Sequence, residues 1–129
     1  MIRNNGRQEG TVMTVTFELV GQELVALNSG PVFSFSPAIS LFVKCETQNE
    51  MDYLWEKLSG GGEKEQCGWL KDKYRVSWQI VPTVLGHMLL DKDAGKTEKV
   101  MKALLKMGKI DIQKLKQAYE KSNPDNNLK

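Results

Sequence analysis

Residues 38–59, AISLFVKCETQNEMDYLWEKLS, decide the fold of this chain. The first nine residues alternate between two faces, and this period of two predicts a strand over 38–46. Thr47 and Glu50 then form a Thr-x-x-Glu capping box, which marks the start of a helix. Apolar residues recur along one side of that helix: Met51, Leu54, Trp55 and Leu58. We expect this helix to pack on the apolar face of the strand, formed by Ile39, Leu41 and Val43.

The segment that follows, KEQCGWLKDKYRVSWQIVP (residues 64–82), predicts a β-hairpin with its turn near residues 71–73. Its last strand stops at Pro82, which cannot donate to a sheet ladder. Two faces alternate along this strand: Val76, Trp78 and Ile80 on one, and Ser77, Gln79 and Val81 on the other. The glycine run 60–62 follows a helix and lacks the Gly-Lys-Ser/Thr ending, so it indicates a helix exit rather than a phosphate-binding loop.

Before this module, the β-rich residues 11–28 predict another hairpin, which turns near Gly21 and Gln22. Residues 1–10 are polar, and we expect them to form a loop or a disordered lead. The order of elements is therefore a hairpin, a strand–helix–hairpin module and a helical tail. This order is typical of an α+β fold with a mostly antiparallel sheet.

Three polar residues mark the helices expected in the tail, residues 83–120. Thr83 is a candidate cap for a short helix through Leu90, and Asp93 for a helix to about Met107 that Gly108 ends. Asp111 is a candidate cap for the last helix. We expect residues 121–129 to be disordered.

Composition and charge exclude several classes of protein. The 129 residues suit one domain, 40% are hydrophobic and 26% are charged, and the net charge is only +2. A dedicated nucleic-acid surface is more basic than this. There is neither a membrane-spanning apolar run nor an apolar signal core near the N-terminus, so the default expectation is a cytoplasmic protein without a membrane partner. The two cysteines, Cys45 and Cys67, are expected to be reduced and structural, and the single histidine, His87, excludes a His-rich metal site.

Four stretches resemble one known family: GTVMTVTFELVGQELVALN (10–28), residues 38–59, QCGWLKDKYRVSWQIVPTVLG (66–86) and VMKALLKMGKIDIQKLKQAYE (100–120). They are similar to the PhnB-like proteins, also called 3-demethylubiquinone-9 3-methyltransferase-like domains. These belong to the vicinal oxygen chelate superfamily, with glyoxalase I, extradiol dioxygenases and bleomycin-binding proteins.

The resemblance implies a glyoxalase/bleomycin-resistance-like fold, in which two βαβββ modules curve around a cleft. Residues 38–82 supply one complete module, and the hairpin over 11–28 is what remains of the other, without its usual strand–helix–strand. We expect all 129 residues to form one domain of this kind. The incomplete module implies an exposed sheet edge and an exposed apolar face, which a homodimer, with exchanged modules as one arrangement, would cover.

The resemblance also locates the metal positions of the catalytic relatives at Ala26, at Ala38 or Ser40, and at Gln79. A dication needs several anionic or imidazole ligands, and these residues offer none, so we predict neither a metal nor a cofactor. The methyltransferase label finds no support in the residues, because a glycine-rich strand-to-helix turn for S-adenosylmethionine is missing. Cys67 would be a nucleophile only with a base nearby, and His87 is the sole histidine.

A cleft remains as the candidate site. Its predicted ligand-binding residues are Asn28, Ser40, Phe42, Trp69, Tyr74, Ser77 and Gln79. The alternative interpretation of Phe42 and the tryptophans is that they are core residues. Three functions stay open: a metal-free module that binds a small organic ligand, an enzyme acting on a small organic molecule, and a degenerate fragment that only dimerises.

One position departs from the family pattern. The relatives usually have glycine where this chain has Arg75. If the backbone there has a positive φ, arginine costs roughly a kcal/mol or more. The hairpin would then be reshaped, and a ligand contact from the neighbouring Tyr74 becomes less favourable.

Overall fold

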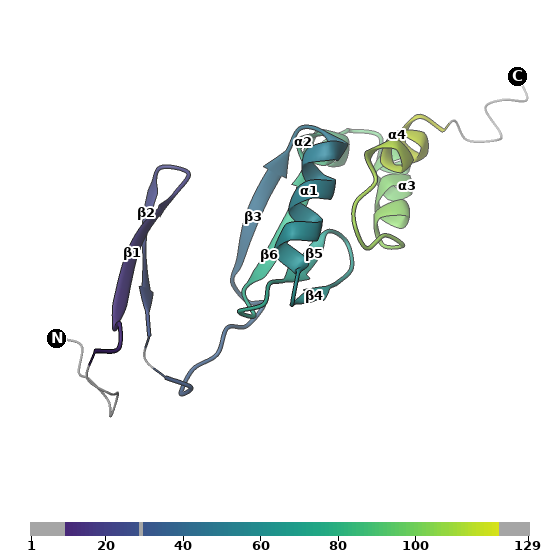
Figure 1. Cartoon of the computed structure of the whole chain (residues 1–129). Helices are drawn as coiled ribbons and strands as arrows, with labels where there is room; N and C mark the ends of the chain where they lie inside the picture. Colours follow the sequence, from purple (N-terminus) through teal and green to yellow (C-terminus); the bar gives the residue numbers. More distant parts are fainter. Residues whose placement is uncertain (1–9, 29, 122–129) are drawn as a thin grey trace, which may run out of the picture. The chain divides into compact units, whose positions relative to one another are not determined.

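The computed structural model describes residues 10–28 and 30–121, and these form two compact units that divide between Ser34 and Phe35. In the first unit, β1 (Thr14–Leu19) and β2 (Gln22–Leu27) form an antiparallel hairpin (Figure 1). Its turn residues Val20 and Gly21 both have positive φ, 49° and 77°, as the favoured two-residue hairpin turn requires. The predicted hairpin is confirmed. The expectations for residues 1–10 and 121–129 fall almost wholly outside the described residues, and the single-domain organisation stays a prediction.

The second unit is built on a four-stranded sheet with one helix on it (Figure 1). Its elements, in chain order, are β3 (Ser40–Cys45), α1 (Gln48–Ser59), β4 (Glu63–Lys64), β5 (Trp69–Lys71) and β6 (Ser77–Pro82). The strand order is β3-β6-β5-β4, with β3 parallel to β6 and the other pairs antiparallel. This is the predicted βαβββ module in an α+β fold, with a mostly antiparallel sheet.

The capping box of α1 forms as predicted. The hydroxyl of Thr47 accepts a hydrogen bond from the Glu50 amide at 3.2 Å, and the Glu50 carboxylate accepts one from the Glu46 amide at 3.2 Å. The helix buries Met51 and Trp55 on one face of the sheet, where they join the core. The strand residues on this face are Cys45, Leu70 and Ile80, with Val43 and Trp78 packed against them, whereas the buried Val81 lies on the opposite face of β6.

Three helices follow the sheet: α2 (Thr83–Leu89), α3 (Ala94–Leu104) and α4 (Ile112–Glu120). Asp93 and Asp111 cap α3 and α4 as predicted, with side-chain oxygens that accept from backbone amides of the first turn. Within residues 10–28 and 30–121, no helix has the length and apolar character needed to cross a membrane.

Two details of the predicted tail are wrong. Pro82, rather than Thr83, occupies the N-cap of α2, because the Thr83 hydroxyl donates to the Glu46 carboxylate at 3.0 Å. The helix α3 ends at Leu104 rather than near Met107. The chain tightens there, because the amides of Lys106 and Met107 donate three residues back, to the carbonyls of Ala103 and Leu104 at 3.2 and 3.0 Å.

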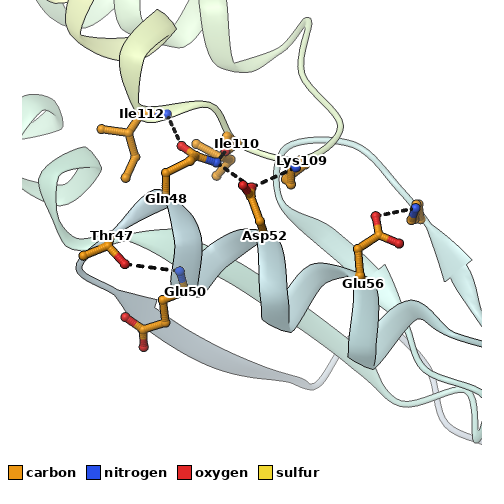
Figure 2. A network of polar contacts seen from close by, with 9 residues as sticks. Thr47, Gln48, Glu50, Asp52, Glu56, Lys109, Ile110 and Ile112 are labelled. Carbon is orange, nitrogen blue, oxygen red and sulfur yellow. Dashed lines mark hydrogen bonds and ion pairs between the residues drawn. The ribbon is translucent and has the colours of Figure 1, made fainter.

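The tail is docked on the module through the first turn of α1 (Figure 2). The Gln48 side chain donates to the Ile110 carbonyl at 3.1 Å and accepts from the Ile112 amide at 2.8 Å. The Gln48 side-chain amide nitrogen also donates to the Asp52 carboxylate at 2.9 Å, and this carboxylate lies 2.8 Å from the Lys109 ammonium. The hydrogen bond from Gln48, and then Lys109, lower the pKa of Asp52. One glutamine thus satisfies two backbone groups of the segment that enters α4.

Candidate functional site

A cavity of about 500 Å³ lies on the sheet face opposite α1. Successive side chains of a strand point to opposite faces of the sheet. The cavity residues of β3 and β6 alternate with the core residues that face α1, so they lie on the opposite face. The sheet residues that line the cavity are Phe42, Lys44, Trp69, Gln79 and Val81. The other wall comes from Cys67, from the segment Pro82–Leu90, which contains α2, and from Leu104. The tail therefore completes a site that the sheet begins.

Gln79 occupies the middle of the sheet wall, opposite Phe42 on β3 and Trp69 on β5. Its side-chain amide nitrogen donates to the Ser40 hydroxyl at 2.9 Å, and both residues are half-buried. This bond positions the Gln79 side chain along the sheet and uses one of its donors. Its carbonyl oxygen makes no hydrogen bond within residues 10–28 and 30–121, so it can accept one from a ligand.

Of the seven predicted ligand-binding residues, the structure brings Phe42, Trp69 and Gln79 together on the cavity. Ser40 touches the site only through Gln79. Ser77 is fully buried on the same sheet face but does not line the cavity, and its hydroxyl has no hydrogen-bond partner within the described residues.

The two remaining predicted residues lie elsewhere. Tyr74 is exposed and lines a separate depression beside the end of α1, with Gly60 and Asp72 among its neighbours. Asn28 follows β2 in the first unit, where its side chain donates to the Val12 carbonyl at 3.2 Å. The ligand-binding role of all seven residues stays a prediction.

Sequence reasoning missed Lys44 and the α2 wall. Lys44 lies two residues beyond Phe42 on the same strand, so the period of two could have identified it. The α2 residues carried no such signal, because their position depends on how the tail docks on the sheet. His87 lines the cavity from α2 and is exposed.

The two cysteines lie in different environments. Cys45 is fully buried in the core, where burial first, and the nearby Glu50 second, raise the pKa of its thiol to about 11. Cys67 is half-buried on the cavity, and its thiol donates to the Leu104 carbonyl at 3.5 Å. Its backbone has a φ of 60°, which a side-chain-bearing residue rarely adopts. Cys67 and His87 line the same cavity, yet no hydrogen bond joins them within the described residues, so they do not form a nucleophile–base pair.

Gly68 holds the cavity wall against the tail. Its φ is +83°, and an added Cβ would lie 2.8 Å from both the Ile110 Cδ1 atom and the Ile80 carbonyl oxygen. Only glycine fits such a position. Its amide donates to the Gly108 carbonyl at 2.9 Å, beside the 2.8 Å bond from the Cys67 amide to the Met107 carbonyl. The loop before β5 is thus fixed to the segment between α3 and α4.

The residues at the site do not fit a metal ion. Within residues 10–28 and 30–121, no three His, Cys, Asp or Glu side chains come together as a ligand set. At the positions that the superfamily uses, Ala38 has no donor atom, and Ser40 and Gln79 offer only neutral oxygens, of which the Ser40 hydroxyl already accepts a hydrogen bond from Gln79. The site does not fit S-adenosylmethionine either, because the link from β3 to α1 is Glu46-Thr47, without glycine.

Comparisons with known proteins agree with this architecture. The sequence profile of the 3-demethylubiquinone-9 3-methyltransferase family matches residues 2–81. Among solved structures, the chain is similar to a PhnB protein from Bacillus cereus that carries the same methyltransferase family name. The two are 40% identical, the similarity covers 64% of this chain and 74% of that chain, and the TM-score is 0.55. No functionally curated protein matches the chain. The chain therefore belongs to the PhnB-type 3-demethylubiquinone-9 3-methyltransferase family, with its glyoxalase-like fold.

Proposed function

We propose that this protein is a small-molecule-binding module that works without a metal ion, and that the cavity beside Gln79 is its ligand site. The cavity itself is the observation that carries the proposal. Its volume of about 500 Å³ falls within the roughly 300–1,000 Å³ typical of ligand pockets. Its lining is mostly apolar with a few polar groups, which is the usual composition of such sites.

The polar groups support binding rather than metal-assisted chemistry. Gln79 presents a carbonyl oxygen held in place by its bond to Ser40, and Trp69 presents a half-buried aromatic ring. These groups orient a ligand through a hydrogen bond and a stacking contact. The methyltransferase name describes the family. The polar groups that line this cavity do not supply the chemistry that the name suggests.

A screen for stabilising ligands tests the proposal. We expect at least one compound of a broad small-molecule library to raise the melting temperature in a dose-dependent manner. A ligand at 100 times its dissociation constant adds about 2.7 kcal/mol of stability.

Gly86 offers a matched pair of variants. It lies on α2, lines the cavity, and a Cβ added there meets nothing within 4 Å. Gly86→Leu should narrow the cavity and reduce the ligand-induced shift, whereas Gly86→Ala should keep it. A library that stabilises the native protein no more than Gly86→Leu contradicts the proposal.

We also propose a homodimer, with exchange of the β1–β2 hairpin between copies as one arrangement. The hairpin supports this proposal, because three large apolar residues on one of its faces are exposed: Val15, Phe17 and Leu19. A two-stranded hairpin alone is marginally stable in water.

We further propose a cytoplasmic location, which two unpaired cysteines favour, because thiols stay reduced there.

A further inference from the structure

We propose that the ligand of this cavity is an organic acid: a molecule with an apolar, preferably aromatic, body and a single carboxylate that pairs with the Lys44 ammonium. This inference rests on the proposed function and names the class of ligand that the site would take.

The charges around the cavity carry the first step. Lys44 is the one Lys or Arg side chain on the cavity lining, and the lining residues include neither Asp nor Glu. Within residues 10–28 and 30–121, Lys44 has no acidic partner within 4.0 Å. The acidic residue nearest to Lys44 in the sequence, Glu46, accepts a hydrogen bond from the Thr83 hydroxyl instead. The cavity therefore presents a positive charge that a ligand anion can neutralise.

The apolar walls strengthen this attraction. Val81, Leu85 and Leu104 are buried residues that line the cavity. A bound ligand displaces water from such walls, and an ion pair gains strength as the surrounding dielectric constant falls. The His87 imidazole also lines the site and can share in binding the carboxylate, whereas the Thr83 hydroxyl donates its single proton to Glu46.

The rings on the sheet wall determine the rest of the ligand. Phe42 lines the cavity from the sheet face and is 52% exposed, so a ligand can cover its ring. Trp69 lies on β5, and its register partner Gln79 is also the register partner of Phe42, so Gln79 separates the two rings. An aromatic or branched apolar body that covers these rings would bury surface worth roughly 25 cal/mol per Å². The acid group then faces Lys44, two residues along β3 from Phe42.

Cys67 provides a direct readout of occupancy. It lines the cavity, whereas Cys45 is fully buried with a raised pKa, so a thiol reagent should label Cys67 in the folded protein. The reagent should be uncharged, such as 4,4′-dithiodipyridine, because an anionic reagent would itself compete for the site. A ligand in the cavity slows this labelling.

The probes are 1-naphthylacetate and its neutral counterpart 1-naphthylacetamide, which differ in charge but hardly in size. We expect the acid to protect Cys67 at a concentration about tenfold lower than the amide, a difference that one ion pair in a partly apolar site can supply. Lys44→Met should remove this preference, and Lys44→Arg should keep it. Lys44 is exposed, so the melting temperature without ligand should hardly change in either variant.

The outcomes separate this inference from the proposed function. Equal protection by the acid and the amide, or a preference for the acid that persists in Lys44→Met, overturns the anion inference and leaves the cavity as a ligand site. Failure of both probes, and of four further acid–amide pairs with larger apolar bodies, to protect Cys67 in the native protein overturns the inference and removes support from the proposed function. Gly86→Leu serves as the narrowed-cavity reference in each assay.

Discussion

Arg75 has a backbone conformation that most residues avoid, because its φ is 73°. In the left-handed region a residue with a Cβ loses about 1–2 kcal/mol relative to its preferred conformation. Asp72 holds the turn in this shape: its carboxylate accepts from the amides of Tyr74 and Val76 at 2.9 and 3.0 Å, and its backbone carbonyl accepts from the Arg75 amide at 2.9 Å. The positive φ considered from the sequence is therefore present.

Replacing this arginine tests how much strain the turn stores. We expect Arg75→Gly to stabilise the protein by about 1 kcal/mol, because glycine adopts this φ without a steric penalty. The ion pair lost with Glu63 is 3.8 Å long and mostly exposed, and such pairs contribute little. Thermal unfolding should show a rise of about 4 °C. Arg75→Ala is the control, since it removes the ion pair and keeps the strain, and it should not be stabilised. A glycine variant less stable than the native protein would contradict this account.

At the scale of elements, the helices and their caps could be predicted because their signals are local. The Thr47–Glu50 box, Asp93 and Asp111 each act within one turn of their own helix. Thr83 misled the prediction because its hydroxyl has an acceptor 37 residues away, on Glu46. Tertiary contacts of this kind leave no trace in the residues next to a cap.

The candidate site also has one wall that could be predicted from the sequence and one that could not. Strand alternation places Phe42 and Gln79 on one face, so the sheet wall could be predicted from a period of two. The wall formed by α2 could not, because it depends on the docking of the tail. That docking uses side-chain bonds between distant segments, such as those of Gln48 with Ile110 and Ile112.

The Gln48 contact predicts a measurable coupling between α1 and α4. Gln48→Ala should destabilise the protein by about 2 kcal/mol, because it leaves an amide and a carbonyl of the tail without partners in a partly buried place. Chemical denaturation measures this loss, and hydrogen exchange should accelerate first in α4. Glu56→Ala on the same helix is the control. It removes an exposed pair with Lys64 and should cost less than about 0.5 kcal/mol. Equal effects of the two variants would show that Gln48 does not hold the tail.

At the scale of the whole molecule, the hairpin predicts self-association. We expect light scattering after size exclusion to give twice the chain mass of 14.6 kDa. Phe17→Asp should shift the protein towards the monomer, because this residue shares its face of the hairpin with Val15, Leu19 and Leu24. Thr16→Asp, on the opposite face, is the matched control and should remain dimeric. A native protein that is monomeric at tens of micromolar would exclude the homodimer.

The hydrophobic core extends well beyond the part of the chain that matches the family. The match to the family ends at residue 81, yet among the described residues seven of the thirteen buried apolar core residues follow Pro82. They include Val100, Ile110 and Leu115, which are fully buried. A chain trimmed at the family boundary would therefore keep the recognisable sequence and lose half of its interior. We therefore expect residues 2–81, which match the family, not to fold without the residues that follow them.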